Sequence, residues 1–336
     1  MKNSRIVGLG RYLPERIVTN HDLTKIMDTS DEWIQERSGI KERRFFELGK
    51  DTTANMGTKA SLMALENAGL TPDDVDFIIF ATLSPDYNFP GSGVLVQHEL
   101  GIKEVGALDI RTQCTGFVYG LSVADQFIKT GMYKTILVIG SEIHSSGLDL
   151  TTRGRAVSVL FGDGAGAAVL QATEEEGRGI LSSHLHSEGK YAEELSVVNP
   201  SSSRAAPRLT KEMVENPEPK GIFPYMNGNH VFKHAVTRFP EAIMEALKTN
   251  GYTTDDLDLL VPHQANLRIS QFIQQKLGLP DEKVYNNIMR YGNTTAASIP
   301  IAMSEAWEEG KIKDGDLICL AAFGSGFTWG SVLIRW

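Results

Sequence analysis

Apolar residues along the chain follow two alternating patterns, short continuous runs and longer stretches with helical spacing. The run VDFIIFAT over 75–82 predicts a buried strand, and the stretch from Thr52 to Ala68, closed by Gly69, has the spacing of an amphipathic helix. Apolar runs over 135–140 and 317–322 predict two more strands. Alternating strands and helices are typical of α/β proteins, in which helices sandwich mostly parallel or mixed sheets.

This pattern occurs twice in the sequence. GLTPDDVDFI over 69–78 resembles GYTTDDLDLL over 251–260, so that Asp258 corresponds to Asp76. A single repeat of about half the chain is not a solenoid, which needs several short repeats. We therefore expect two similar βαβαβ-type halves with pseudo-two-fold symmetry, residues 1–172 and 173–336, and a site where the halves meet.

The segment 187–229 breaks this repeat. It contains PSSS at 200–203 and further prolines at 207, 217, 219 and 224. This composition predicts an irregular insert that lies on the surface. Two roles stay open for the insert, a lid or wall over a pocket and a passive connector between the halves.

A cysteine lies where the chain is expected to turn from strand into helix. A strand over 105–110 precedes Cys114, and apolar residues return at helical spacing from Phe117 onward. Unpaired N–H groups and the positive end of the helix dipole would favour the thiolate and lower the pKa of this thiol. The sequence leaves two interpretations open, a nucleophile and a buried core cysteine.

Two polar residues of the second half lie at comparable points of the repeat. Asn293 occupies the position that corresponds to Cys114, and His263 follows the strand expected over 257–261. Polar residues at strand ends and helix starts of paired halves can meet at one crevice. Asn293 could cap a helix through its side-chain oxygen, donate its amide to a developing oxyanion, or do both. His263 taken alone could equally be structural.

Two glycine-rich segments resemble ligand loops. FGDGAG at 161–166 is followed by a strand rather than a helix, which excludes a dinucleotide loop. AFGSGFTWG at 322–330 joins two expected strands, either as a tight hairpin or as a source of backbone N–H groups for an oxyanion hole. Cys319 lies in the preceding apolar run and is expected to be inert core.

Composition and charge exclude several classes of protein. The chain has 336 residues and a net charge of −9, so nucleic acid is not an expected partner. No apolar stretch approaches the ~18 residues of a membrane span, so no membrane association is expected. The chain has two cysteines, and neither belongs to a C-x-x-C pair, which predicts a reducing, cytoplasmic location. No metal site is expected.

Long, ordered motifs surround the candidate residues. VPHQANLRI at 261–269, GNTTAAS at 292–298, FGDGAGAAVL at 161–170 and GFTWGS at 326–331 resemble those of the β-ketoacyl-[acyl carrier protein] synthase III family, condensing enzymes of the thiolase superfamily. The resemblance runs from Ile6 to the C-terminus, interrupted mainly by the insert. It implies a thiolase-like fold, a homodimer, and an acyltransferase that takes acyl-CoA and malonyl-[acyl carrier protein] as substrates and needs no cofactor.

The resemblance also implies a reaction. Cys114 would accept an acyl group from a primer acyl-CoA, with the backbone N–H groups of Cys114 and Ser325 as the oxyanion hole. His263 and Asn293 would hold the thioester carbonyl of malonyl-[acyl carrier protein] while CO₂ leaves. The enolate would attack the acyl-cysteine and give β-ketoacyl-[acyl carrier protein], the initiating condensation of fatty acid synthesis.

Binding residues follow from the same resemblance. The positions that match coenzyme A contacts are Trp33 and Arg153 around the adenine, Arg37 at a phosphate, and Gly228 and Asn266 along the pantetheine channel. The positions that match the acyl pocket are Phe161, Phe323 and, inserted by the partner subunit, Phe89. The positions that match carrier-protein docking are Lys233, Arg268 and Lys276. Two departures from the family are Gln275, where some members have lysine, and Ser325, where members often have glycine.

Three other functions stay open at this point. A specialised condensing enzyme or acyltransferase of secondary metabolism would use CoA thioesters without a carrier protein. A cysteine thioesterase would release the acyl group to water, although no acidic partner for His263 is evident in the sequence. A non-catalytic acyl-binding protein would not need Cys114, His263 and Asn293 intact. The primer also stays open, and acetyl, branched-chain, medium-chain and aromatic groups are all compatible with the sequence.

Overall fold

The computed structural model describes residues 3–202 and 208–336. Its strands form two large mixed sheets and two small two-stranded ones. The first large sheet has the order β1 (Asn3–Tyr12), β7 (Gly164–Thr173), β6 (Thr135–Glu142), β4 (Phe77–Ala81) and β5 (Gly106–Ile110). The second has the order β8 (Gly179–Ser187), β13 (Thr328–Arg335), β12 (Leu317–Gly324) and β11 (Leu259–Pro262).

The two large sheets have matching strand orders and directions. In the first, β4 is parallel to β5 and β6, and β7 is antiparallel to β6 and β1. In the second, β11 is parallel to β12, and β13 is antiparallel to β12 and β8. Val284 pairs in parallel with Leu260 at the place that β5 takes in the first sheet. The predicted α/β class with mixed sheets is confirmed, whereas the boundary expected between residues 172 and 173 stays a prediction.

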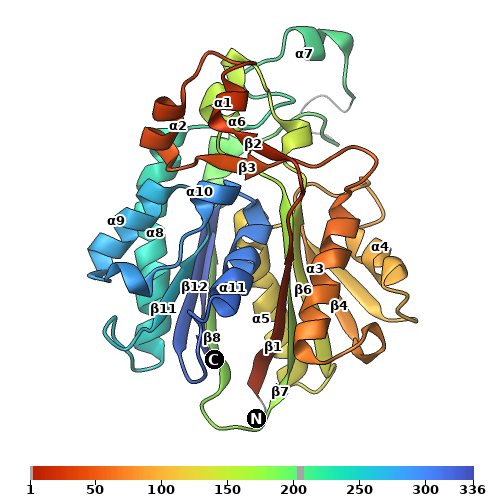
Figure 1. Cartoon of the computed structure of the whole chain (residues 1–336), viewed down its shortest axis with the longest axis vertical. Helices are drawn as coiled ribbons and strands as arrows, with labels where there is room; N and C mark the ends of the chain where they lie inside the picture. Colours follow the sequence, from red (N-terminus) through yellow and green to blue (C-terminus); the bar gives the residue numbers. More distant parts are fainter. Residues whose placement is uncertain (1–2, 203–207) are drawn as a thin grey trace.

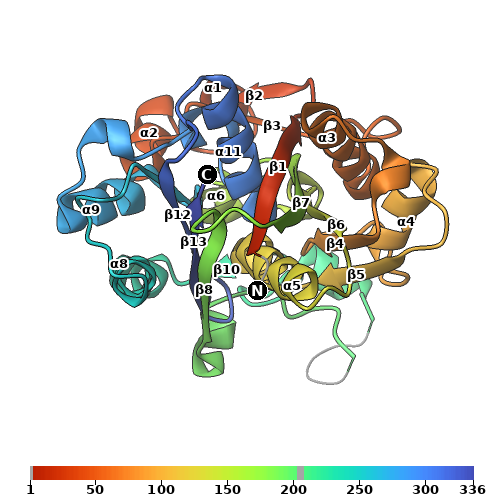
Figure 2. The same cartoon turned by 90° about the horizontal axis from the view of Figure 1, so that it is seen from below.

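Helices cover both outer faces of the sheets and fill the space between them (Figures 1 and 2). The outer helices are α3 (Thr53–Ala68) and α4 (Ser92–Glu99) on the first sheet and α8 (Gly228–Thr249) and α9 (Leu267–Leu277) on the second, and the central helices are α5 (Gly116–Lys129) and α11 (Ser298–Glu308). Within the described part of the chain, no helix has the length and apolar character needed to cross a membrane.

The helix α3 begins and ends where the sequence predicts. The Thr52 hydroxyl accepts a hydrogen bond from the Asn55 N–H, and the Asn55 side chain accepts one from the Thr52 N–H, which completes a capping box. Gly69 ends the helix at φ 67°, a left-handed conformation that glycine adopts without strain. The strand β1 packs directly on this helix, because a Cβ at Gly10 would lie 2.2 Å from the Ala60 carbonyl oxygen.

The central helices join the two sheets through one apolar core. Phe117 and Leu121 of α5 and Ile299 and Met303 of α11 are buried in a single cluster with strands of both sheets. Full burial of such a side chain contributes roughly 1.5–3 kcal/mol of transfer free energy. The starts of the two central helices are therefore held firmly in place, and two of the candidate catalytic residues, Cys114 and Asn293, lie just before these starts.

Smaller elements cap one end of the sheets, at the top of Figure 1. They are β2 (Ile17–Thr19), α1 (Asn20–Leu23), α2 (Asp31–Ser38), β3 (Glu42–Arg44), α6 (Arg155–Ser158) and α10 (Ile288–Tyr291). The insert adds the 3₁₀ helix η5 (Gly189–Glu194), β9 (Leu195–Ser196), α7 (Lys211–Glu215) and β10 (Tyr225–Met226), and β9 pairs with β10. Residues 203–207 of the insert lie outside the described residues.

Candidate active site

The two central helices begin with matching tight turns. The 3₁₀ turn η2 (Gln113–Thr115) leads into α5, and the 3₁₀ turn η7 (Thr295–Ala297) leads into α11. Gln113 and Thr295 have positive φ angles, 47° and 53°, and no other non-glycine residue of the described chain does. A left-handed conformation is unfavourable for these residue types and often marks a functional constraint. Both halves of the protein therefore place a constrained turn at the same point of the fold.

Cys114 is the middle residue of the first turn and is buried. Burial, together with the carboxylate of Glu142, raises the pKa of its thiol to about 12. Backbone N–H groups of Ser325 and of Cys114 itself hydrogen bond to the sulfur and act in the opposite direction. The lowered pKa expected from the sequence is wrong for this structure, because the loss of water around the sulfur outweighs the N–H groups of the turn.

Glu142, at the end of β6, is a buried carboxylate that the sequence analysis missed. It accepts hydrogen bonds from the Leu83 N–H (3.1 Å), the Ser84 hydroxyl (2.7 Å) and the Ala296 N–H. Burial raises the pKa of Glu142 to about 7. The carboxylate thus joins the loop after β4 to the second turn. The available signal was an acidic residue two positions after the apolar run 135–140.

The end of β12 passes beside the sulfur of Cys114. A Cβ at Gly324 would lie 2.6 Å from the Cys114 Cβ and 3.0 Å from its Sγ, so any larger residue would collide with the cysteine. The next residue, Ser325, directs its N–H to the sulfur, and its hydroxyl donates a hydrogen bond to the Leu195 carbonyl. The two N–H groups predicted for an oxyanion hole therefore lie together, and the insert is tied to them through β9.

His263 follows β11 and is buried at the boundary between the halves. Its N–H donates to the Ala321 carbonyl (2.8 Å), and its Nδ1 lies 2.6 Å from the Ser298 hydroxyl oxygen. Its Nε2 is buried and has no hydrogen-bond partner among residues 3–202 and 208–336. Burial lowers the pKa of His263 to about 3, so the imidazole is neutral. A Ser298 hydroxyl that donates to Nδ1 leaves the imidazole hydrogen on Nε2, where it is available to a substrate.

Asn293 lies two residues before the second turn, in which Ala296 takes the place of Cys114. The predicted equivalence of Asn293 and Cys114 is therefore wrong by three residues, because the repeat of the folded turns has an offset of 182 rather than 179. Its Oδ1 accepts a hydrogen bond from the Thr295 N–H (2.9 Å). Its backbone is fixed by the Leu160 carbonyl (2.8 Å) and the Gly162 N–H (3.1 Å). The side-chain oxygen thus stabilises the turn while the amide NH₂ remains available as a donor, which is how the sequence analysis reconciled the capping and oxyanion interpretations.

One cavity of about 480 Å³ brings the candidate residues of both halves together. Cys114 comes from the first half, and His263 and Asn293 come from the second. The cavity also reaches more exposed residues selected for binding, namely Trp33, Arg37, Gly228, Asn266 and Arg268. Phe161 and Phe323 contribute apolar lining. The cavity therefore connects the protein surface to a buried thiol flanked by two hydrogen-bond donors.

A second cavity of about 340 Å³ extends from Cys114 toward the insert. Phe161 belongs to both cavities, and its ring stacks on the His144 ring at 3.9 Å between centroids. Leu195 also lines both cavities, and the insert contributes Val197 to the second. Of the two roles left open for the insert, the structure favours a pocket wall over a passive connector.

Of the residues predicted to bind coenzyme A, all except Arg153 line the first cavity. The Arg37 guanidinium lies over the Trp33 indole at 4.3 Å from the ring centroid. Arg153 instead pairs with Asp149 at 2.6 Å and does not line the cavity. Arg155, which the sequence analysis did not select, lies 5.2 Å from the Trp33 ring centroid. The only sequence signal for Arg155 is that it belongs to the same short basic segment as Arg153.

The residues predicted for carrier-protein docking and for insertion into a partner subunit lie on the surface, whereas Cys319 lies in the core. Lys233 of α8 and Lys276 of α9 are exposed, and Arg268 is exposed where it lines the first cavity. Phe89 is 86% exposed in the loop after β4, and it lines neither cavity. Cys319 is fully buried in the apolar cluster between the second sheet and α8, where inert core was expected.

The arrangement suits two kinds of chemical step. A buried thiol beside two backbone N–H groups suits acyl transfer through a covalent thioester. A neutral imidazole and a carboxamide in the same cavity suit stabilisation of a second developing oxyanion. The first pair of donors comes from both halves, Cys114 and Ser325, whereas the second pair comes from the second half alone, and all of them lie around the Cys114 sulfur or the cavity that contains it.

Comparisons with known proteins agree with one another. Residues 108–189 match the family model for 3-oxoacyl-[acyl-carrier-protein] synthase III, and residues 247–336 match the model for its C-terminal part. The chain is 46% identical over 336 residues to β-ketoacyl-[acyl-carrier-protein] synthase III 1 of Bacillus anthracis, with 99% of each chain covered.

Solved structures give the same result. The 3-oxoacyl-[acyl-carrier-protein] synthase III of Aquifex aeolicus aligns with a TM-score of 0.90 at 44% identity, covering 99% of this chain and 100% of that one. The priming β-ketosynthase of the R1128 polyketide biosynthetic pathway aligns with a TM-score of 0.89 at 33% identity, covering 99% of this chain and 96% of that one.

Proposed function

The chain belongs to the β-ketoacyl-[acyl carrier protein] synthase III family, and from this premise we propose that it condenses a primer acyl-CoA with malonyl-[acyl carrier protein], with loss of CO₂. The product is a β-ketoacyl-[acyl carrier protein], which initiates fatty acid synthesis. The observation that carries the proposal is the convergence of Cys114, His263 and Asn293, from two halves of the fold, on one cavity.

The first half-reaction loads the enzyme. The Cys114 sulfur attacks the carbonyl carbon of the acyl-CoA thioester, and the oxyanion of the tetrahedral intermediate accepts hydrogen bonds from the Cys114 and Ser325 N–H groups. The bond to the CoA sulfur then breaks, and the thiol proton leaves with CoA. Because the pKa of the Cys114 thiol is raised to about 12, the thiol is protonated at rest and its proton must leave as the attack occurs.

The second half-reaction makes the new carbon–carbon bond. The thioester carbonyl of the malonyl group accepts hydrogen bonds from His263 Nε2–H and from the Asn293 amide. The electrons of the bond to the carboxylate form an enolate as CO₂ leaves, and the enolate carbon attacks the acyl-cysteine. The Cys114 sulfur departs and recovers a proton. One positioned oxyanion donor is worth about 3 kcal/mol in such steps.

Substrate binding follows the cavity. Trp33, Arg37 and Asn266 line its outer part, where they would hold the nucleotide and pantetheine of CoA. Arg153 would have to leave Asp149 to stack on adenine, whereas Arg155 already lies beside Trp33. Gly228 lines the same channel, and Phe161 and Phe323 form apolar walls.

The family resemblance implies an acidic carrier protein. The surface of this enzyme that binds the carrier protein should therefore be basic. Lys233, Arg268 and Lys276 supply positive charge from α8 and α9, and Arg268 lies at the cavity itself. With a net charge of −9, any electrostatic steering must come from this local surface.

We also propose a homodimer formed through the edge of the first sheet. The strand β5 is one of the two edge strands of that sheet, as Figure 2 shows, and Leu108 of β5 is exposed. Tyr87 and Phe89 are exposed in the loop after β4, and a partner subunit would cover them and receive Phe89 in its acyl pocket. Light scattering coupled to gel filtration would test this, and a monomer at micromolar concentration would contradict it.

The alternatives are less well supported. The thioesterase alternative lacks an acidic partner for His263, whose Nδ1 contacts Ser298 instead. The specialised condensing enzyme is represented among the relatives at 33% identity, against 46% for a β-ketoacyl-[acyl carrier protein] synthase III. The primer, the cytoplasmic location and the lack of a cofactor remain predictions.

Intact-protein mass spectrometry tests the proposal directly. The enzyme is incubated with a panel of acyl-CoAs and then with malonyl-[acyl carrier protein]. The expected result is one acyl adduct on Cys114 that malonyl-[acyl carrier protein] discharges as a β-ketoacyl product. Discharge only by malonyl-CoA or by water would overturn the proposed reaction in favour of the specialised or hydrolytic alternative.

A further inference from the structure

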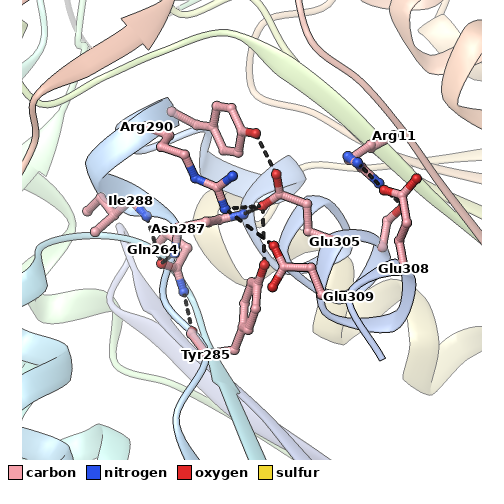
Figure 3. Close-up of polar contacts among 11 residues, drawn as sticks. Arg11, Gln264, Tyr285, Asn287, Ile288, Arg290, Glu305, Glu308 and Glu309 are labelled. Carbon is pink, nitrogen blue, oxygen red and sulfur yellow. Dashed lines mark hydrogen bonds and ion pairs between the residues drawn. The ribbon is translucent and has the colours of Figure 1, made fainter. Parts of the chain in front are cut away.

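A buried carboxylate lies behind the catalytic loops and takes no part in the reaction described above. Glu305 of α11 is 4% exposed, and several donors converge on its two oxygens (Figure 3). The Asn287 amide donates at 2.7 Å, the Arg290 guanidinium at 3.0 Å and the Tyr291 hydroxyl at 2.5 Å. A carboxylate with three close donors in a buried site is a strong and geometrically specific anchor.

All of these donors belong to the chain segment that ends at Asn293. Asn287 precedes α10, Arg290 and Tyr291 belong to α10, and Tyr291 is separated from Asn293 only by Gly292. Glu305 therefore fixes this segment at several points along its length. The position of the Asn293 amide depends on the course of this segment, because Asn293 is its last residue.

The same network reaches His263 through its neighbour Gln264. The Gln264 Oε1 accepts from the N–H groups of Asn287 (3.0 Å) and Ile288 (3.2 Å), and its Nε2 donates to the Pro262 carbonyl (2.7 Å), as Figure 3 shows in part. Of these three partners, Pro262 precedes His263, and Asn287 and Ile288 belong to the segment that ends at Asn293. The amide of Gln264 thus joins the two loops that carry the catalytic donors.

The helix of Glu305 also contacts His263 directly. Ser298, which holds His263 Nδ1, begins α11, and Glu305 lies two helical turns further along the same helix. One helix therefore sets the imidazole at its first residue and the Asn293 segment through Glu305. Cys114 and Ser325 make no hydrogen bond to Glu305 or Gln264 within residues 3–202 and 208–336.

We propose that Glu305 is a positioning residue for the decarboxylation half-reaction, which it serves by holding the His263 and Asn293 loops in register through Asn287 and Gln264. This inference rests on the proposed function. Acyl loading needs Cys114 and backbone N–H groups from other loops, so loss of Glu305 should impair the discharge of the acyl-enzyme and leave its formation intact.

The test is Glu305→Gln, with acyl loading and discharge measured separately. A glutamine would place an NH₂ group among converging donors and so loosen the segment before Asn293. We expect loading from acyl-CoA to stay within about threefold of the wild-type rate. Discharge by malonyl-[acyl carrier protein] should fall by about 10- to 100-fold, through kcat rather than KM. Glu305→Asp, which keeps the charge, should recover part of this loss.

A matched control lies on the same helix. Glu308 is exposed and pairs with Arg11 at 2.5 Å, as Figure 3 shows, and Glu308→Gln should leave both half-reactions unchanged. Tyr291→Phe removes one bond to Glu305 and keeps the ring, so it should reduce discharge by about three- to tenfold. This milder variant carries the test if Glu305→Gln does not fold.

Two results would overturn the inference. One is discharge at the wild-type rate in Glu305→Gln and Tyr291→Phe, and the other is an equal loss of loading and discharge, which a general loss of structure would produce. A wild-type enzyme that loads but is never discharged by malonyl-[acyl carrier protein] would instead overturn the proposed function, and with it any role of Glu305 in that step.

Discussion

The turn that carries Cys114, the proposed nucleophile, and the turn that follows Asn293 have the same backbone conformation but different side chains. Gln113 and Thr295 take the same left-handed conformation, and each turn leads into one of the two central helices. In the first turn the next residue is Cys114. In the second, Asn293 lies two residues before Thr295 and caps it. Duplication therefore supplies two equivalent turns at one cavity, and the candidate catalytic residue lies within the first turn but two residues before the second.

The surroundings of the two turns also differ. Near the first, burial and Glu142 keep the Cys114 thiol protonated, since its pKa is raised to about 12. Near the second, burial lowers the pKa of His263 to about 3, and Ser298 orients the ring. Both reacting side chains are therefore neutral at pH 7. A neutral site suits thioester substrates, whose carbonyl groups acquire charge only during the reaction.

Removing the proposed nucleophile should give the largest effect. Cys114→Ser replaces the thiol with a poorer nucleophile and a poorer leaving group, and its small change in volume should leave the fold intact. We expect loading and condensation to fall by roughly three orders of magnitude or more. Intact mass after incubation with acyl-CoA measures loading, and an unchanged melting temperature serves as the control. Condensation by Cys114→Ser at the wild-type rate would contradict the mechanism.

Removing a donor at the second turn should separate the two turns functionally. Asn293→Ala deletes the amide and should reduce discharge by malonyl-[acyl carrier protein] about 10²- to 10³-fold, the usual range for one oxyanion donor. Loading of Cys114 should change little, because its oxyanion hole consists of backbone N–H groups. Single-turnover mass spectrometry resolves the two rates. Equal loss in both would mean that the turns do not divide the reaction as proposed.

Much of this division could be predicted from the sequence. Cys114, His263 and Asn293 lie at strand ends and helix starts, which local patterns locate, but the predicted equivalence of Asn293 and Cys114 is wrong, because the turns match Gln113 with Thr295 and so Cys114 with Ala296. The fold class followed from the same patterns. The fold class is confirmed, and the three residues line one cavity, because such predictions depend on periodicity and on chain order, both of which a sequence records directly. The catalytic roles of the three residues stay predictions.

The properties that the sequence did not predict correctly depend on residues far apart in the chain. The pKa of the Cys114 thiol is raised because Glu142 and the β12 end enclose it, and no local motif indicates that enclosure. Arg155 rather than Arg153 lies beside Trp33, which is a matter of side-chain rotamers at the surface. The polar contacts of Glu305 likewise join segments that only the folded chain brings together.

A methyl group at the contact between β12 and the first turn should disturb loading selectively. Gly324→Ala would place its Cβ 2.6 Å from the Cys114 Cβ, so either β12 or the nucleophile must move. We expect loading to fall about 10- to 100-fold and stability to fall by about 1–3 kcal/mol. Gly189→Ala is the control, because nothing lies within 4 Å of its added Cβ. Normal loading by Gly324→Ala would show that this contact does not position the sulfur.

The charge of Glu142 should be visible in the pH dependence of cysteine reactivity. Its pKa is raised to about 7, so the carboxylate becomes charged as pH rises through 7 and then opposes ionisation of the Cys114 thiol. Glu142→Gln should therefore react with iodoacetamide about two- to fivefold faster than the wild type at pH 8. The two rates should converge at pH 6, where the wild-type carboxyl is protonated. A constant ratio from pH 6 to pH 8 would indicate that packing, not charge, links the two residues.

Each half of the protein contains one cysteine, and the second should have the smallest effect. Cys319 lies inside β12, is fully buried and contacts only core, and burial raises its pKa to about 12. Cys319→Ala removes one sulfur atom, so we expect a loss of about 1 kcal/mol in stability from the small cavity and no change in loading or discharge. Urea unfolding and the two half-reaction rates measure these effects.

Two thiols with equally raised pKa values would then differ completely in reactivity, because only Cys114 has N–H donors and a substrate cavity beside its sulfur. A clear loss of activity with normal stability in Cys319→Ala would show that burial alone does not make a cysteine inert in this fold.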